Sequence, residues 1–348
     1  MLEYKSHACA SMILDLAYIR KLERFFASNP CMDFNVRSEI LYPLLDKIFK
    51  KGDVFELELA NNLRFEYVYT STIAKEILLR EHENPSHAWE PMTTKAIELV
   101  LDNRPGAALI GGAYFGDHAL IAARQLKCQG NTSPVLCIEP NTKQGELLIK
   151  NATINNLQDL VIWNKDVLWD QPGCRFHLND QDSLASVKLD QNSSYISNTI
   201  DNIVASHSIE CLSLLMLDIE GSEEKALKGA TSILEQPAND APVVIVEVHR
   251  SYVNWDNGLL KTEIVKFLLR HGYDVYALRD CQLNWELGLK MPEIIPLDKV
   301  YLDGPPHGFN LIASKVNNFF DDLGFKRVSN VSPKYLRHRD PSLHFPLS

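Results

Sequence analysis

Short apolar runs alternate with amphipathic segments through the central part of this 348-residue chain. The predicted strands lie at 107–111, 135–138, 160–163, 212–217 and 243–248, and the predicted helices between them lie at 117–126, 143–151 and 223–234. A strand that is apolar along its whole length is buried on both faces, which is typical of a parallel sheet covered by helices on both sides. The alternation therefore predicts an α/β fold around a mostly parallel sheet.

The regions on either side of this alternation have different patterns. Residues 1–88 contain apolar residues at helical spacing and an alternating stretch at 53–69 that predicts a hairpin. We therefore expect a mainly helical extension at 1–88, one α/β domain at 89–315 and a polar tail at 316–348. The extension is expected to act as a lid or as a homodimer interface, and the sequence leaves both open. An insertion at 171–208, rich in Ser, Asn and Asp, is interpreted as hairpin and loops.

The net charge of the chain argues against some classes of binding partner. The chain has 45 acidic and 35 basic residues, a formal net charge of −10, which argues against nucleic acid or an anionic membrane as the main partner. No run of about 18 apolar residues predicts a membrane span, and the first residues do not have the pattern of a signal peptide, so we expect a cytoplasmic protein. The seven cysteines include no CxxC pair, which favours reduced thiols over disulfides or a zinc site.

A glycine-rich segment and an acidic residue predict a cofactor site. The segment GGAYFG at 111–116 directly follows one predicted strand and precedes a helix, where small residues let a ligand approach the backbone. Glu139 ends the next strand, where an acidic residue accepts hydrogen bonds from the hydroxyls of an adenosine ribose. Together they predict an adenosine-containing ligand, bound by Gly112, Ala113, Tyr114, Gly116, Glu139 and Asn141. The spacing is not GxGxxG, which makes an NAD-dependent oxidoreductase the less favoured alternative.

Acidic residues also follow the two later strands. Asp218 ends the fourth predicted strand, and Glu247 and His249 end the fifth, two residues apart and so on one side of it. The carboxyl ends of parallel strands face one crevice, so Asp218, Glu247 and His249 are the predicted catalytic residues. Glu220 and Glu223 precede or begin the next helix, and we expect Glu223 to have a structural, capping role there.

Four motifs occur in order along the chain: GGAYFG, then IEPN with Leu148, Asn151 and Asn155 after it, then LDIEGSEEKALKGA, then VVIVEVH. This series resembles the FkbM family of S-adenosylmethionine-dependent methyltransferases over about residues 89–315. The resemblance implies a class I methyltransferase (Rossmann-like) fold, whose mostly parallel seven-stranded sheet has one reversed strand at its edge. It also implies S-adenosyl-L-methionine as cofactor, with Asp166 at the adenine amino group. The implied reaction is O-methylation of a small-molecule hydroxylated acceptor, a sugar or another specialised (secondary) metabolite.

The chain departs from the family pattern at three positions. Ile110 stands in place of an Asp, Tyr114 in place of an Asn and Met216 in place of a Lys. Backbone contacts at Gly112 and Gly116 would survive these changes. The departures motivate an alternative from another class, a catalytically inactive methyltransferase-fold scaffold, although the polar residues kept in both halves of the predicted site argue against it.

A hydroxyl acceptor has to lose its proton during methyl transfer, so the site needs a base or a metal ion. In one mechanism His249 is the general base and Glu247 or Asp218 orients it. In the other, these three residues ligate a divalent cation such as Mg²⁺. The first is preferred, because magnesium sites rarely use imidazole. Two other histidines carry weaker expectations: His307 near the acceptor pocket, and His118 exposed near the cofactor.

Overall fold

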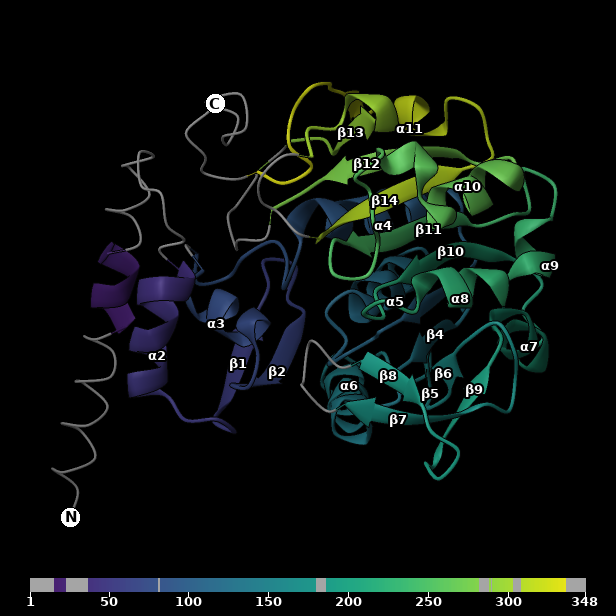
Figure 1. Cartoon of the computed structure of the whole chain (residues 1–348). Coiled ribbons are helices and arrows are strands. Elements are labelled where there is room, and N and C mark those ends of the chain that lie inside the picture. The colour runs from purple at the N-terminus through teal and green to yellow at the C-terminus, as the bar shows by residue number, and fades with distance from the viewer. Residues whose placement is uncertain are drawn as a thin grey trace, which may run out of the picture.

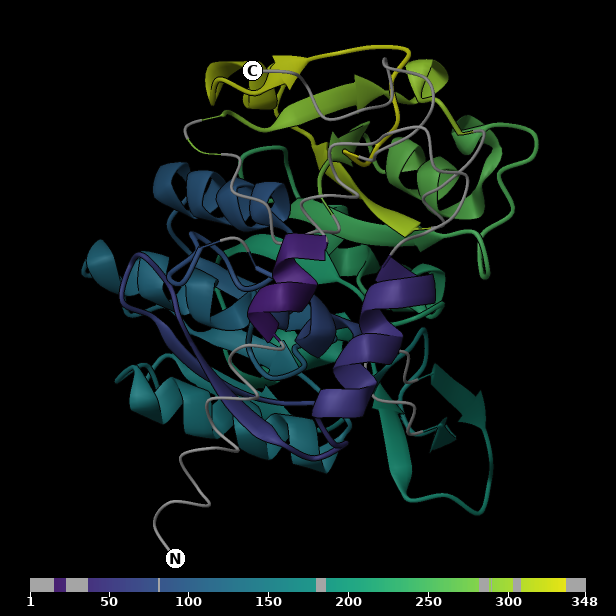
Figure 2. The ribbon, with the colours of Figure 1, turned by 90° about the vertical axis from the view of Figure 1, so that its left-hand side faces the viewer.

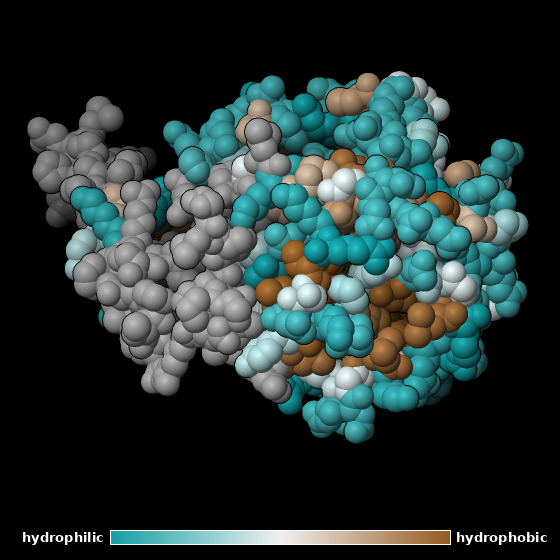
Figure 3. All heavy atoms as spheres, turned by 90° about the horizontal axis from the view of Figure 1, so that it is seen from above, coloured by the Kyte–Doolittle hydropathy of each residue, from teal (hydrophilic) through white to brown (hydrophobic). Residues whose placement is uncertain are grey.

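The computed structural model describes residues 16–22, 37–80, 82–179, 186–281, 288, 290–302 and 308–335. A large sheet with its helices forms the main body, and a smaller N-terminal part lies to one side of it (Figure 1). Figure 2 looks onto that side and shows the N-terminal helices in front of the main body. The face seen from above is mostly hydrophilic, with hydrophobic residues gathered around a hollow (Figure 3). Within the described ranges, no helix is long and apolar enough to cross a membrane.

The main sheet has nine strands in the order β15-β13-β12-β14-β11-β10-β3-β4-β5. Their bounds are β3 (Ala107–Gly111), β4 (Val135–Ile138), β5 (Val161–Asn164), β10 (Leu212–Leu217), β11 (Val243–His249), β12 (Asp274–Arg279), β13 (Glu293–Pro296), β14 (Gly308–Ser314) and β15 (Lys326–Arg327). Strands β5, β4, β3, β10 and β11 pair in parallel, whereas β14 runs antiparallel between β11 and β12. The mostly parallel α/β sheet is confirmed. Two details differ from the implied fold: β13 and β15 extend the sheet to nine strands, and the reversed strand β14 lies inside it.

Helices pack on both faces of this sheet. They are α4 (Pro91–Asn103), α5 (Ala119–Cys128), α6 (Thr142–Ile154), α7 (Ile200–Ser206), α8 (Glu223–Lys228), α9 (Thr231–Leu234), α10 (Glu263–Arg270) and α11 (Phe319–Asp322), with the 3-10 turns η3 (Leu259–Lys261) and η4 (Leu297–Lys299). Alternate strand residues face opposite sides, so Leu109 and Ile110 belong to two different core clusters. The predicted helix at 223–234 is two helices. The chain turns at Gly229, where a side chain would collide with the backbone carbonyl of Trp169.

The N-terminal part contains a hairpin and short helices. Its elements are the helical residues 16–22, the π-helix η1 (Arg37–Leu41), α2 (Tyr42–Ile48), β1 (Val54–Glu58), β2 (Arg64–Val68) and α3 (Thr72–Leu78). The predicted hairpin is confirmed, because β1 and β2 pair antiparallel. Leu45, Phe65 and Ile77 are buried in the same core cluster as Ile110 of the main sheet, so this part shares its core with the main body.

Two asparagines, one in α6 and one directly after it, join β2 to the main body. The side chain of Asn151 accepts a hydrogen bond from the N–H of Glu66 (2.8 Å) and donates one to its carbonyl (2.9 Å). Asn155 does the same with Arg64, at 2.8 and 2.6 Å. Asn151 also donates to the carbonyl of Phe115 in the glycine-rich loop (2.9 Å). The two side-chain amides therefore bond the backbone groups of β2 as a neighbouring strand would. Asn151 also connects β2 to the predicted cofactor loop.

The insertion and the C-terminal residues extend the main body. The inserted strands are β6 (Val167–Leu168), β7 (Arg175–Asn179), β8 (Ser186–Leu189) and β9 (Tyr195–Asn198), and they form a small sheet in the order β6-β9-β7-β8. Within the expected tail at 316–348, α11 and β15 pack on the main sheet, and Lys334 is 1% exposed. As far as residue 335 the chain therefore differs from the expectation of a polar tail, and residues 336–348 lie outside the described part.

Candidate active site

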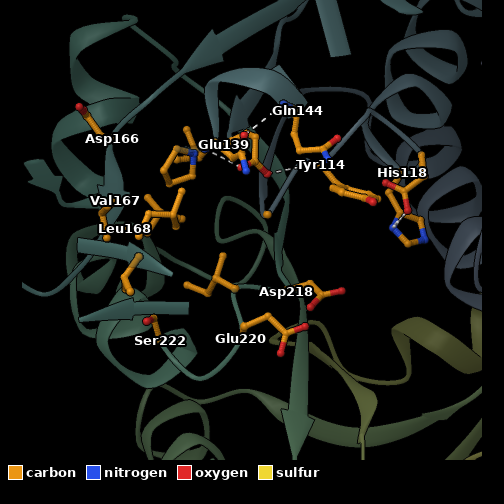
Figure 4. Close-up of a pocket in the computed structure, with 18 of the residues that line it drawn as sticks. Tyr114, His118, Glu139, Gln144, Asp166, Val167, Leu168, Asp218, Glu220 and Ser222 are labelled. Atoms are coloured by element: carbon orange, nitrogen blue, oxygen red, sulfur yellow. Dashed lines mark hydrogen bonds and ion pairs between the residues drawn. The ribbon is translucent and has the colours of Figure 1, made fainter. Parts of the chain in front are cut away.

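A pocket opens at the carboxyl ends of β3, β4 and β10, where these strands lead into Gly112, Glu139 and Asp218 (Figure 4). It holds about 870 Å³ of empty space, which includes the open solvent at its mouth. The lining residues are Ile73, Trp89, Gly112, Tyr114, Asp117, His118, Ile138, Glu139, Pro140, Asn141, Gln144, Asp166, Val167, Leu168, Leu178, Val187, Asp218, Ile219, Glu220 and Ser222. They include residues of α3 and of β7 and β8, so the N-terminal part and the insertion both form walls.

The glycine-rich loop forms the floor of the pocket. Gly112 has a φ of +77°, and a Cβ atom there would collide with the backbone carbonyl of Asp218. Gly116 has a φ of +101°, and its Cβ would lie 2.8 Å from Leu148. Gly112 lines the pocket, whereas Ala113 and Gly116, which were also predicted to bind the cofactor, are not among its lining residues. Both glycines are needed for the backbone path itself, which leaves bare backbone at the pocket surface.

Glu139 is held by backbone N–H groups. Its two carboxylate oxygens accept hydrogen bonds from the N–H of Tyr114 (3.0 Å) and from the N–H of Asn141 (2.8 Å). The indole N–H of Trp163 donates to the Glu139 carbonyl (2.9 Å). The side chain of Asn141 caps α6 by accepting from the N–H of Lys143 (3.0 Å). The carboxylate is thus fixed in place on the floor of the pocket.

Tyr114 has a backbone conformation that the asparagine of the family pattern would also adopt readily. Its φ of +46° is in the left-handed region, which asparagine tolerates well and a large residue seldom adopts. The N–H that holds Glu139 is preserved. The phenol hydroxyl donates to Oγ of Ser71 at the start of α3 (3.1 Å), which connects the cofactor loop to the N-terminal part.

The other two departures from the family pattern are partners of each other. Ile110 on β3 and Met216 on β10 are paired in register, and both are buried in the same core cluster. Neither residue lines the pocket. An acidic and a basic residue at these positions would form a buried ion pair, and replacing such a pair by two apolar residues is often neutral or stabilising. These two departures therefore lie in the core and not in the lining of the pocket.

Asp166 and several apolar residues form another part of the pocket lining, next to the end of β5. Asp166 follows β5, and its Oδ2 accepts a hydrogen bond from the side-chain amide of Asn198 (3.0 Å). Val167 and Leu168 lie beside it, and the inserted strands add Leu178. An acidic acceptor next to apolar walls suits a flat heteroaromatic ring with an exocyclic amino group.

Three carboxylates meet across the pocket from Glu139. Asp218 and Glu220 line the pocket and are labelled in Figure 4. Together with Glu247 from β11, each offers one oxygen, and these three atoms all lie within 4.8 Å of one another. Glu220 was not among the predicted catalytic residues. Its φ of +53° directs the chain from β10 into the turn before α8.

Burial and mutual repulsion raise the pKa of each carboxyl in this cluster. The pKa of Glu220 is raised to about 7, first by burial and then by Glu223. The pKa of Glu247 is raised to about 8, first by burial and then by Glu220. The pKa of Asp218 is raised well above its ordinary value by the same causes. Near neutral pH, the cluster therefore holds protons unless a positive charge is bound beside it.

His249 lies beside this cluster and is not among the lining residues. A Cβ atom on Gly308 would lie 2.6 Å from the His249 ring and 2.7 Å from Glu247, so the two side chains share one side of β11, as predicted. The Nδ1 atom of His249 accepts a hydrogen bond from the N–H of Ser251 (3.1 Å). In a neutral ring the proton is then on Nε2, which donates rather than accepts.

Glu223 has the structural role that was expected. Its carboxylate accepts hydrogen bonds from the N–H groups of Ile219 (2.9 Å) and Gly221 (3.0 Å) in the turn before α8. These bonds hold the turn in the shape that presents Asp218 and Glu220 to the pocket. The carboxylate is therefore already occupied by the backbone.

His118 is a buried residue in the wall of the pocket. The expectation that it is exposed is wrong, because it is 4% exposed and lines the pocket. Its Nδ1 lies 3.9 Å from Oδ2 of Asp117, and its Nε2 has no hydrogen-bond partner within the described part of the chain. The available signal was its position, two residues after Gly116 and directly before α5. His307 lies outside the described residues.

The stretch of the chain that contains most of this pocket is similar to known methyltransferases. Residues 111–275 match the family model described as "Methyltransferase FkbM domain". A solved methyltransferase FkbM from Methylobacillus flagellatus is 18% identical with a TM-score of 0.37, over 60% of this chain and 43% of that one. An O-methyltransferase from Bacillus cereus in complex with SAH is 15% identical (TM-score 0.36, 66% and 84% covered). A SAM-dependent methyltransferase from Agrobacterium tumefaciens is 11% identical (TM-score 0.41, 76% and 71% covered). No curated protein matches the chain.

Proposed function

We propose that this chain, whose residues 111–275 match the FkbM methyltransferase domain model, is an S-adenosylmethionine-dependent O-methyltransferase acting on a hydroxylated small molecule. One observation carries the proposal. A single pocket contains Glu139 and Gly112, which suit the cofactor, and across from them the carboxylates of Asp218 and Glu220 (Figure 4). The acceptor would be a sugar or another specialised metabolite, and a cytoplasmic location stays a prediction.

The residues present fit the cofactor. Glu139, fixed by two N–H groups, offers a carboxylate to the ribose hydroxyls, and Gly112 leaves bare backbone beside it. Asp166 and the apolar residues around it suit the adenine ring. When bound, S-adenosylmethionine supplies an activated methyl group for displacement by an acceptor oxygen. Because Ile110 and Met216 lie away from the pocket, the inactive-scaffold alternative loses its main support.

On the acceptor side, the chain has to position a hydroxyl and remove its proton. The carboxylates of Asp218 and Glu220 can accept hydrogen bonds from neighbouring hydroxyls, as on a sugar ring. The described lining residues include no Lys or Arg that could pair with a phosphate or carboxylate group, which disfavours acceptors that carry one. The tautomer of His249 favours the carboxylate cluster over His249 as the place where the proton is taken up. The cluster would act either directly as a base or through a bound cation such as Mg²⁺.

The first test is isothermal titration of the full chain with S-adenosylhomocysteine. We expect micromolar binding that is lost in Glu139→Ala, because this carboxylate holds the ribose. Glu146→Ala is the matched control: Glu146 is an exposed residue of α6 and does not line the pocket, so its affinity should equal that of the wild type. NAD, used as a second ligand, should not bind.

Acceptors can then be screened with radiolabelled S-adenosylmethionine and a panel of neutral, cationic and phosphorylated sugars and phenols. We expect label to pass to neutral or cationic compounds, and the phosphorylated members to be poor acceptors. Failure of the wild type to bind S-adenosylhomocysteine would contradict the proposal. Transfer to a carbon or a nitrogen in place of an oxygen would keep the methyltransferase and refute O-methylation.

A further inference from the structure

We propose that Asp218, Glu220 and Glu247, with the amide oxygen of Asn310, form a site for one divalent cation of the Mg²⁺ or Mn²⁺ class. The site is distinct from the cofactor half of the pocket and lies on its acceptor side. Its role in methyl transfer rests on the function proposed above, whereas its existence can be tested without any acceptor.

The geometry of the three carboxylates suits a single ion. They come from the end of β10, from the turn after it and from the end of β11, so parallel neighbouring strands hold two of them in fixed relation. One oxygen from each lies within 4.8 Å of the others. Two oxygens bound to the same Mg²⁺ are at most about 4.2 Å apart. Small side-chain rotations are therefore enough to bring the three atoms onto one ion.

Asn310 supplies an independent observation that points to a ligand. It is the register partner of Glu247 across β14 and β11, so both side chains leave the same face of the sheet. Its amide nitrogen donates to Oε2 of Glu90 (2.6 Å) and Oγ1 of Thr93 (3.0 Å), at the start of α4. Because Nδ2 is bonded to these two residues, Oδ1 lies on the other edge of the planar amide. This oxygen belongs to a side chain that is 1% exposed, and it has no partner in the described part of the chain.

The charges around the cluster also favour a cation. Lys334 is the basic residue that acts on Glu247, but its Nζ is bound to Oε1 of Glu90 at 2.6 Å. Its charge is thus shared with another buried carboxylate. The negative charges of Glu247, Glu220 and Glu90 all repel a negative charge on Asp218. A divalent ion would balance most of this negative charge at the point where the three oxygens converge.

The chemistry of the donors selects the class of ion. All four donors are oxygen atoms, which hard cations such as Mg²⁺, Mn²⁺ and Ca²⁺ prefer, whereas zinc sites use His or Cys. The ligand set differs from the one expected from the sequence, because Glu220 takes the place of His249. An acceptor hydroxyl bound to such an ion would release its proton more easily, which is what O-methylation requires.

The test is titration of Mn²⁺ into the full chain after dialysis against EDTA, by isothermal titration and by electron paramagnetic resonance. We expect one Mn²⁺ per chain, competed by Mg²⁺. Asp218→Asn and Glu247→Gln should each weaken binding at least tenfold, and Glu220→Gln, in the turn, several-fold. Glu224→Gln is the control, because this exposed carboxylate of α8 pairs with Lys228 and should leave the affinity unchanged.

Each variant is also titrated with S-adenosylhomocysteine, which reports whether the pocket is folded. Loss of Mn²⁺ binding with cofactor affinity retained supports the cation site. A wild-type chain that binds S-adenosylhomocysteine but not Mn²⁺ overturns it and leaves the methyltransferase proposal standing. Mn²⁺ binding that is the same in Asp218→Asn and Glu247→Gln as in the wild type also overturns it. Mn²⁺ binding without cofactor binding contradicts the proposed function alone.

Discussion

At the scale of single residues, His118 and His249 differ in which ring nitrogen is available. Nδ1 of His249 accepts from a backbone N–H, which leaves Nε2 as a donor. Nδ1 of His118 faces Asp117, and Nε2 has no partner within the described ranges. With its proton on Nδ1, His118 keeps an acceptor at Nε2, a buried atom of a residue that lines the pocket. It is therefore the histidine better suited to bind a hydroxyl of the acceptor.

This difference predicts a selective effect of His118→Gln. We expect the KM for the acceptor to rise about tenfold, as for a lost hydrogen bond to a buried group. The affinity for S-adenosylhomocysteine should stay within about twofold, because the ribose end of the pocket is untouched. Steady-state kinetics and calorimetry measure the two quantities. His207→Gln, at the end of α7, serves as the control, and equal losses of both quantities in His118→Gln would speak against a role in acceptor binding.

The sequence could indicate which residues lie in the site where a motif stands at the end of a strand, and not elsewhere. Gly112, Glu139 and Asp218 line one pocket, and each lies at the carboxyl end of a strand, where the sequence could place it. Glu220 was not predicted to join Asp218 and Glu247, because its contribution depends on a left-handed residue in the turn after β10. Such a turn has no sequence periodicity.

At the scale of elements, the pair Asn151 and Asn155 holds β2 on α6. Asn151→Ala removes hydrogen bonds to Glu66 and Phe115 and leaves backbone groups without partners in a buried place. We expect a loss of about 2–4 kcal/mol in the free energy of unfolding. Asn155→Ala, at a half-buried position, should cost about 1 kcal/mol. Urea denaturation of both variants checks the order, and equal effects would contradict it.

The element pattern was predictable where strands are fully buried. The strands of the parallel core match the apolar runs because burial on both faces demands such runs. The two outermost strands on one side of the sheet, β13 and β15, were not predicted, because they are short and are stabilised by pairing rather than by their own composition. The break between α8 and α9 depends on a close approach to Trp169, a contact distant in the sequence.

At the scale of the whole molecule, the carboxylate cluster predicts a dependence of stability on pH. In the folded chain Glu220 and Glu247 keep protons up to pH values of about 7 and 8, whereas their ordinary pKa is 4.5. Between the ordinary pKa of 4.5 and the raised values of about 7 and 8, the folded state binds more protons than the unfolded state. The contribution of the cluster to the free energy of unfolding therefore falls as pH rises from about 5 to 8.

Glu247→Gln tests this dependence. Without metal, the variant should lose stability less steeply than the wild type over this pH range and have a Tm several degrees higher at pH 8, since about 1 kcal/mol corresponds to about 2–4 °C. Thermal unfolding at a series of pH values in EDTA makes the comparison. A constant difference in Tm between the two proteins at every pH would contradict the raised pKa of Glu247.

The core that the N-terminal part shares with the main sheet limits how the two parts can change during evolution. Leu45, Phe65 and Ile77 of the N-terminal part are buried together with Ile110 of the main sheet, and Tyr114 reaches across to Ser71. A catalytic half separated at residue 89 would expose this apolar surface to water and would aggregate rather than stay folded. The N-terminal part therefore cannot be exchanged between relatives as an independent module. Its sequence and that of the cofactor loop have to change together, so a substitution on one side should be matched by one on the other.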